Sequence, residues 1–430
     1  MKERIGVDNC VEEPERAWVI ECGSRYWHDL PAVEALPVPK ARDSLGLRFV
    51  RVELPSWAAD LGVGSPPSLA VDSGSLVGAD GVDWWTAAFR FLTGAAERRH
   101  EFAAGPVHSY AFRLRGIDAM AFENAWVNRI MLFLQRWSMR EAGAKEIQPP
   151  RARFDLTHDV DAVRKTPELR FKQGAFEFLN AGRLMVRRRP VESGQRLAAG
   201  IRFAARGGEL STWHQIRALE TQCSVKSTFH VYAGPAGRQR KGRALLLDPA
   251  YDVASLTDTL RLLRDGGWTI GLHPGFDAWR DTSELGAQRE ILERVVGASV
   301  QRCRQHWLRF SWAETWEAQE QAGLRLDSTL GFNDRPGFRN GAALRFRPWN
   351  FSRRAPLGLE VIPLVLMDSH LYDYELLDDR ARQAEMRRWV DEVAAVGGEA
   401  SFLWHQQTIH PDYGWLSGYR ELLQLVSDGS

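Results

Sequence analysis

The segment ARFDLTHDV, residues 152–160, has the composition of a β-strand, carries Asp159 near its end and is followed by Asp161. From this point to the C-terminus, strand-like and helix-like segments alternate. The further strand-like segments are SVKSTFHVYAG (224–234), WTIGLHPG (268–275), SVQRCRQHW (299–307), LRLDSTL (324–330), LEVIPLVLMD (359–368) and ASFLWHQQ (400–407). Such alternation predicts parallel strands joined by helices, with about seven strands in the sheet.

Residues 1–148 have a different pattern. Short apolar runs broken by Pro and Gly precede two helical stretches, at 83–97 and 121–143. The segment KEIQPPRAR (145–153) contains a Pro pair that is typical of a linker. We therefore predict a smaller mixed α+β domain of unknown role over residues 1–148 and a catalytic α/β domain over residues 149–430.

The composition excludes several classes of protein. The 430 residues contain 56 Lys and Arg against 55 Asp and Glu, which gives no signature of nucleic-acid binding. The N-terminal residues lack the apolar core of a signal peptide, and no run approaches the roughly 18 apolar residues that span a bilayer, so we expect a cytoplasmic protein. The four cysteines form no CxxC pair, which argues against a disulfide scaffold or a cysteine zinc site.

Polar residues occupy the ends of the predicted strands. Asp159 and Asp161 end the first strand, His273 ends the third, and His405 ends the last. In an α/β barrel these ends meet at one open face. Carboxylates and histidines gathered there are the material for a metal site with an adjacent proton-transfer group. Taken singly, such an Asp is more often a cap or turn residue and such a His a structural one; their joint position favours the metal site.

The segments LTHDVD (156–161), STFHVYAG (227–234), IGLHPGFDAW (270–279), CRQHWLRF (303–310) and FLWHQQ (402–407) follow one another in a recognisable order. Their order and spacing resemble the motifs of the polysaccharide deacetylase family, which is the NodB-homology or carbohydrate esterase family four. The resemblance covers residues 149–430 and implies an irregular (β/α)7 barrel. The part before the barrel loosely resembles the accessory domain of a bacterial subgroup of that family.

The resemblance implies roles for individual residues. Asp159 corresponds to the catalytic base and Asp161 to a metal ligand, although Asp-x-Asp here replaces the commoner Asp-Asp. Arg304 corresponds to the arginine that orients the base, with Arg309 as a competitor, and Asp327 to a carboxylate that pairs with this arginine. His405 corresponds to the histidine that protonates the leaving amine. We assign structural roles to His158 and His306.

The second motif departs from the family pattern. Where the family has His-x-x-x-His, this chain has His273-Pro-Gly-Phe-Asp277. The resemblance then implies one divalent ion held by Asp161, His273 and Asp277, with Zn²⁺ favoured and other divalent ions allowed. A site with only two protein ligands is the alternative.

Two further features leave alternatives open. The segment LGFNDRPGFRN (330–340) resembles a stretch of the bacterial subgroup in which Asp334 and Arg339 line the substrate cleft, but it equally fits an ordered surface loop. The helical region 162–208 contains apolar residues followed by the basic run RLMVRRRP (183–190). It fits either an interfacial helix in peripheral contact with a membrane or a lid over the barrel mouth, although a solvated face is the ordinary explanation of a basic run.

These observations favour a metal-dependent hydrolase that removes an N-acetyl or similar small acyl group from an amino sugar, itself free or lipid-linked, in surface-polysaccharide or glycoconjugate biosynthesis. One alternative is a catalytically impaired deacetylase homologue that binds glycan or acts as a scaffold, because the second histidine of the motif is missing. Another is a deformylase or related amide hydrolase that acts on a lipid-linked or small-molecule substrate.

Overall fold

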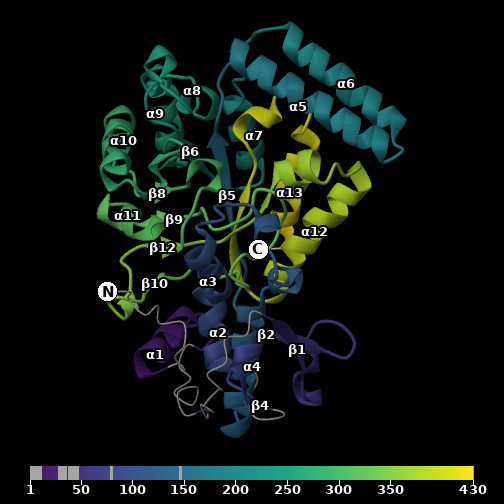
Figure 1. Cartoon of the computed structure of the whole chain (residues 1–430), viewed down its shortest axis with the longest axis vertical. Helices are drawn as coiled ribbons and strands as arrows, with labels where there is room; N and C mark the ends of the chain where they lie inside the picture. Colours follow the sequence, from purple (N-terminus) through teal and green to yellow (C-terminus); the bar gives the residue numbers. More distant parts are fainter. Residues whose placement is uncertain (1–11, 28–35, 37–47, 78–80, 145–147, 430) are drawn as a thin grey trace.

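The computed structural model describes residues 12–27, 36, 48–77, 81–144 and 148–429. Its centre is an eight-stranded sheet in the order β12-β9-β8-β7-β6-β5-β14-β13, in which every neighbouring pair is parallel (Figure 1). The strands are β5 Arg153–Val160, β6 Thr228–Val231, β7 Thr269–Leu272, β8 Arg302–Cys303, β9 Leu326–Asp327, β12 Glu360–Val361, β13 Leu364–Met367 and β14 Glu399–Leu403. The edge strands β12 and β13 do not pair, so the barrel is open between them.

The predicted α/β barrel is confirmed, with one strand more than the sequence indicated. All seven predicted segments contribute to the sheet, and LEVIPLVLMD supplies two strands, β12 and β13. Ile362 and Pro363 separate these strands. Proline has no N–H to donate to a sheet ladder, so the segment divides there.

Helices surround the sheet. They are α5 Pro167–Val186, α6 Pro190–Ala205, α7 Trp213–Gln222, α8 Ala244–Leu247, α9 Thr257–Asp265, α10 Thr282–Val296, α11 Thr315–Gln321, α12 Asp379–Ala395 and α13 Leu416–Asp428. In Figure 1, α9, α10 and α11 lie on the left flank of the sheet, α12 and α13 lie on the right, and the α5–α6 hairpin lies at the top. Within the described ranges, every helix falls short of the length and apolar content that a membrane-spanning segment needs.

Side chains of β5 point alternately into the barrel and away from it, and those that point inward are polar. Thr157 and Asp159 lie on the face of the strand that meets Arg304 of the β8 end. The opposite face carries His158, whose ring nitrogens contact Trp404 O at 2.6 Å and Glu220 Oε1 at 2.9 Å. Its place outside the barrel accords with the structural role that we expected for His158.

The preceding part of the chain contains α1 Glu13–Cys22, β1 Phe49–Glu53, β2 Ser68–Asp72, β3 Leu76–Val77, β4 Gly81–Val82, α2 Trp84–Leu92, α3 Ala95–Ala104 and α4 Trp126–Glu141, with the short β10 Trp349–Asn350 and β11 Ala355–Pro356 from the later part. One buried cluster continues from this part into the barrel, since Trp18 packs on Trp349 with ring centroids 5.5 Å apart. The Asn128 side chain donates to the carbonyl oxygen of Ala343 and accepts from its backbone N–H. The domain boundary at residue 148 stays a prediction.

Candidate active site

Three side chains that could hold a metal ion meet at the carboxyl ends of neighbouring strands. They are Asp161 after β5, His273 after β7 and His306 after β8, with their ligand atoms all within 4.8 Å of one another. Asp161 Oδ1 lies 3.3 Å from His273 Nε2 and 3.6 Å from His306 Nε2. One carboxylate oxygen and two imidazole nitrogens are a ligand set that divalent metal ions use in proteins.

The surroundings orient these groups towards a shared point. His273 Nδ1 lies 2.7 Å from the carbonyl oxygen of Arg304, so its N–H is used there and Nε2 keeps its lone pair. His306 Nδ1 lies 3.5 Å from Asp248 Oδ1. Within the described part of the chain, the buried Oδ1 of Asp161 accepts no hydrogen bond. A buried, unbonded carboxylate oxygen between two histidine nitrogens fits a divalent cation.

The structure puts His306 where we expected Asp277. The Asp277 carboxylate is exposed and lies 3.5 Å from Arg243 and 3.7 Å from Arg309. The loop from His273 through Pro274 and Gly275 is not helical, and it directs the Asp277 carboxylate to these two arginines and away from the site. His306 continues the alternation of Arg302 and Arg304 at the end of β8, a signal that the sequence contained.

Asp159 lies beside this group, deep in the barrel. Its Oδ2 is 3.9 Å from His273 Nε2, and its Oδ1 is 3.4 Å from Arg304 Nη1. Burial alone would raise the pKa of Asp159, but the neighbouring His273 ring and the Arg304 guanidinium outweigh it and hold this pKa well below its usual range. The carboxylate is therefore ionised at neutral pH.

His230 of β6 is a neighbour of Asp159 that we did not single out from the sequence. Its Nδ1 lies 3.4 Å from Asp159 Oδ1, and burial lowers the pKa of the ring to about 4. The ring packs flat against the backbone of Gly271 on β7, where a Cβ would stand 2.6 Å from its Cδ2. Glycine at that position therefore makes space for the imidazole.

His405 lies on the other side of Asp161 and is held by Asp368. His405 Nδ1 is 2.6 Å from Asp368 Oδ1, and its backbone N–H donates to Oδ2 of the same carboxylate at 2.9 Å. Its free Nε2 is 3.7 Å from Asp161 Oδ2. Burial lowers the pKa of His405, but Asp368 and Asp161 outweigh it and raise this pKa to about 10. Asp368 ends β13, so the strand-end rule that selected His405 would also have selected its partner.

Arg304 has the expected neighbour, but Asp327 does not pair with it. Arg304 is fully buried and donates to Thr157 Oγ1, Ser328 O and Ser401 Oγ. Asp327 instead accepts bonds from Trp316 and Gln319 of α11, and it bonds Thr329. Its side chain leaves β9 on the outer face of the sheet, so the predicted pairing is wrong. Arg309, the competitor, stacks on Phe276 near the surface.

Asp334 and Arg339 connect the two parts of the chain. Asp334 accepts the backbone N–H groups of Ala111 and Phe112, and Arg339, which is buried, forms an ion pair with Glu97 of α3. Both side chains are thus occupied by residues of the preceding part. A buried, paired arginine is unavailable to substrate. We therefore interpret Asp334 and Arg339 as structural residues that join the two parts of the chain, and not as residues of the substrate cleft.

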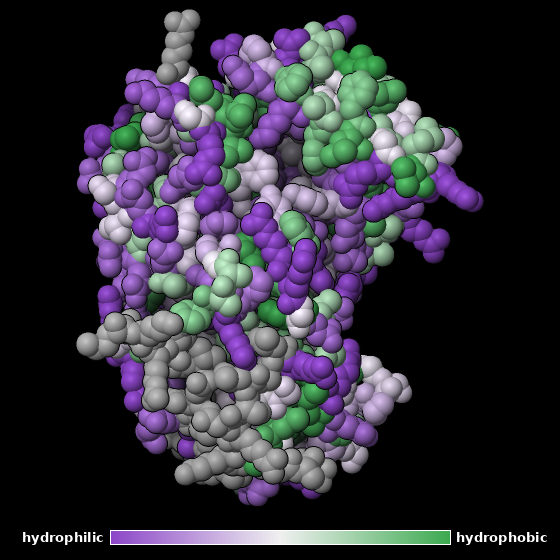
Figure 2. Space-filling model, in the orientation of Figure 1, coloured by the Kyte–Doolittle hydropathy of each residue, from purple (hydrophilic) through white to green (hydrophobic). Residues whose placement is uncertain are grey.

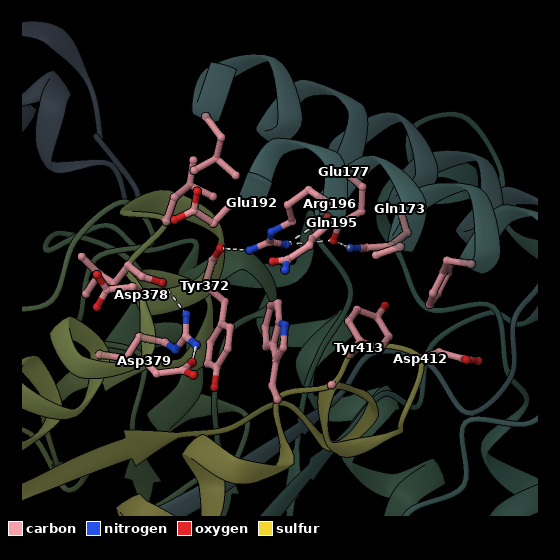
Figure 3. A pocket seen from close by; sticks show the side chains of 18 of the residues that line it. Gln173, Glu177, Glu192, Gln195, Arg196, Tyr372, Asp378, Asp379, Asp412 and Tyr413 are labelled. Atoms are coloured by element: carbon pink, nitrogen blue, oxygen red, sulfur yellow. Dashed lines mark hydrogen bonds and ion pairs between the residues drawn. The ribbon is translucent and has the colours of Figure 1, made fainter. Parts of the chain in front are cut away.

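A cavity of about 410 Å³ opens beside the site, between the α5–α6 hairpin and the loop that follows His405 (Figure 3). Tyr372, Tyr413 and Trp415 stand in it, and the Tyr372 and Trp415 rings stack 4.5 Å apart. Arg196 and Arg382 also line it, paired with Asp373 and Asp379, respectively. None of the groups described above at the metal site lines this cavity, so it is a neighbour of the site and not the site itself.

No protein-family model matches the chain, and a search of curated proteins found no match. Similar solved structures include a protein from Mycobacterium smegmatis assigned as a polysaccharide deacetylase, at 16% identity and a TM-score of 0.41 over 66% of this chain and 86% of that chain. The chitin deacetylase of the fungal pathogen Colletotrichum lindemuthianum is similar at 14% identity and a TM-score of 0.33, over 67% of this chain and 87% of its own.

A pseudoenzyme of carbohydrate esterase family four from Bacillus anthracis is also similar, at 10% identity and a TM-score of 0.31 over 66% of this chain and 62% of that chain. The identities and TM-scores are low in each case.

Proposed function

We propose that this protein is a divalent-metal-dependent hydrolase that removes an N-acetyl or similar small acyl group from an amino sugar. One observation carries the proposal: an Asp161, His273 and His306 group stands with an ionised carboxylate, Asp159, on one side and a charged histidine, His405, on the other. Metal-assisted hydrolysis of an amide uses a metal site, a base and an acid in one place.

Asp161, His273 and His306 would hold the cation, which we propose to be Zn²⁺ or another divalent ion. When bound, such an ion supplies a Lewis acid that polarises a carbonyl oxygen and lowers the pKa of water. The Nδ1 of His273 is held by Arg304 O, and the Nδ1 of His306 faces Asp248 at 3.5 Å. This second layer of contacts keeps each Nε2 directed at the same point as the Asp161 carboxylate.

Asp159 acts as the base. Its Oδ2 accepts the proton of the attacking water, while Arg304 on its other oxygen keeps the carboxylate in position. Arg304 in turn is fixed by Thr157 and Ser401, which come from two neighbouring strands. The base is thereby held by the barrel interior and not by a mobile loop.

His405 acts as the acid. Its Nε2 donates a proton to the nitrogen of the departing amine as the C–N bond breaks, and Asp368 keeps the ring charged and oriented until that point. The products are a carboxylic acid and the free amine. Each proton-transfer group is expected to contribute about 10² to 10⁴ in rate.

An amino sugar is the substrate class that we favour because the motifs resemble those of sugar deacetylases and because aromatic rings line the adjacent cavity. A role in surface-polysaccharide or glycoconjugate biosynthesis, in the cytoplasm, completes the proposal. A formyl group is the main alternative to acetyl, and parallel assays with formylated and acetylated sugars separate the two.

The test is the metal content of the purified protein together with acetate release from N-acetylated sugars. Wild type is expected to hold about one divalent ion. Asp161→Ala is expected to lose both metal and acetate release, whereas Asp159→Asn keeps the metal and loses acetate release. A wild type that binds no divalent ion under any loading condition refutes the hydrolase and leaves the glycan-binding homologue.

A further inference from the structure

The α5–α6 hairpin is fastened to the barrel by polar contacts on its inner face. Arg183 donates to the carbonyl oxygens of Asp373 and Tyr374 at 3.1 and 2.8 Å. Arg189 donates to Leu376 O at 2.6 Å, and Arg196 donates to Tyr372 O. These contacts hold the hairpin against the segment between β13 and α12, so its outer face has a defined direction.

That outer face is apolar on both helices. The exposed positions of α5 recur every three or four residues as Phe171, Ala175, Phe178, Gly182 and Met185, and α6 presents Val191, Leu197 and Ile201. Phe171 is 80% exposed and Val186 is 86% exposed. Figure 2 shows these hydrophobic residues gathered over the hairpin at the upper right of the molecule.

This concentration of apolar side chains is local. In the part of the chain that the structure describes, thirteen large hydrophobic residues are exposed, and eight of them lie on the hairpin: Phe171, Phe178, Leu179, Met185, Val186, Val191, Leu197 and Ile201. Single exposed hydrophobic residues are ordinary, but a contiguous patch indicates a surface that is covered in use.

The hairpin is also the basic part of the molecule. Residues 167–206 contain nine Lys or Arg against three Glu, a net charge of +6. The whole chain carries +1, so the remaining residues sum to −5. Arg183, Arg187 and Arg189 bond the inner segment, whereas Arg188, Arg202 and Arg206 are exposed on the hairpin. The hairpin therefore exposes cations as well as hydrophobic side chains.

We propose that this face lies on an anionic lipid bilayer, in the plane of the interface. An apolar helical face bordered by Lys and Arg is the chemistry that inserts between anionic head groups. A second copy of this chain fits less well, because two such faces would bring cations of the same sign together. A lid role leaves the outer face unexplained, because a lid buries its inner face only.

The position of the hairpin suggests where the substrate comes from; this step rests on the proposed function. α5 begins at Pro167, closely after Asp161, and its Lys172 lies over the Trp307 ring at 4.9 Å, so the hairpin adjoins the barrel mouth. A bilayer on this face brings the mouth to the head-group region. The amino sugar is then one carried on a lipid, and the α5–α6 face positions the enzyme over it.

The experiment is co-sedimentation of the full chain with vesicles of phosphatidylcholine alone and of phosphatidylcholine mixed with phosphatidylglycerol. Wild type is expected to bind the mixed vesicles and to be released by salt. The double variant F178S/L179S should bind at least roughly tenfold more weakly. The double variant R188Q/R206Q should lose roughly tenfold on the mixed vesicles. F102S/L262S, which removes exposed hydrophobic residues from α3 and α9, is the matched control and should bind as wild type does.

Light scattering detects a dimer in solution, and acetate release measures the proposed activity, so the two assays separate the possible outcomes. If the wild type ignores both kinds of vesicle, or if F178S/L179S binds as tightly as the control, the bilayer contact is refuted. A dimer in solution that F178S/L179S abolishes would assign the face to a second copy instead. Acetate release from a water-soluble substrate, measured without vesicles, tests the proposed function separately, since F178S and L179S lie outside the site.

Discussion

His306→Ala is expected to weaken metal binding, whereas Asp277→Ala is expected to leave it unchanged. His306 Nε2 lies 3.6 Å from Asp161 Oδ1 inside the candidate site, whereas Asp277 is exposed beside two arginines. Loss of an outer-layer contact typically weakens metal affinity by about 10- to 100-fold, so loss of a ligand is expected to weaken it by at least about 100-fold. Loss of a surface carboxylate costs about 0 to 1 kcal/mol of stability and no affinity.

The change in metal affinity can be measured from the free energy of unfolding. At a free metal concentration of about 100 times the wild-type Kd, binding adds about 2.7 kcal/mol to the free energy of unfolding. A Kd raised about 100-fold leaves about 0.4 kcal/mol under the same conditions. The assay is urea unfolding of each variant with Zn²⁺ and with chelator, so that each protein is its own reference.

Asp277→Ala is the matched control and should keep the full increment. The reasoning is refuted if Asp277→Ala loses the increment and His306→Ala keeps it, because the two residues would then have the roles that the sequence alone suggested. Loss in both variants would show that the loop and the β8 end act together, which the separation of the two side chains contradicts.

Three further predictions concern charge and hydrogen bonding. Arg304→Lys should lower kcat about 10²-fold or more while metal content is retained, since one ammonium group cannot contact Asp159 and also replace the bonds to Thr157 and Ser401; unchanged kcat would contradict this. His405→Asn should lower kcat by about 10²- to 10⁴-fold with a normal metal content, measured by acetate release; loss of metal instead would make His405 a ligand. Burial raises the pKa of Asp373 from 3.8 to about 7, despite Arg196, so the folded state binds this proton more tightly than the unfolded state does. Wild type should therefore lose stability as pH rises from about 4 to about 7, and Asp373→Asn should lose less; urea unfolding across this range checks it, and parallel curves would count against it.

The barrel could be predicted because its determinants are local. Strand-like segments such as residues 152–160 and 268–275 alternate with helical ones, and parallel strands joined by helices have few arrangements. The strand-end rule also placed Asp159, Asp161 and His405 at one mouth, where the structure brings them together. The division of residues 359–368 into two strands follows from Pro363, which was visible in the sequence and was overlooked.

The remaining assignments depended on tertiary contacts. Asp277 was chosen because it stands where the family motif has its second histidine, but in the folded loop its carboxylate lies beside Arg243 and Arg309. Asp327 was paired with Arg304 although the two side chains leave the sheet on opposite faces. Arg339 lies in a segment that resembles a substrate-cleft motif, but its guanidinium is paired with Glu97, which lies more than two hundred positions earlier in the chain.

The sequence by itself determined the type of fold and the strand ends where chemistry collects, because alternation of strand and helix and the periodicity of each are properties of neighbouring residues. Only the tertiary structure decided which side chains meet there. The exchange of Asp277 for His306, the pairing of Asp368 with His405 and the exposure of the α5–α6 face each depend on the direction in which distant segments pack. No local pattern encodes that direction, since it follows from burial of the whole core.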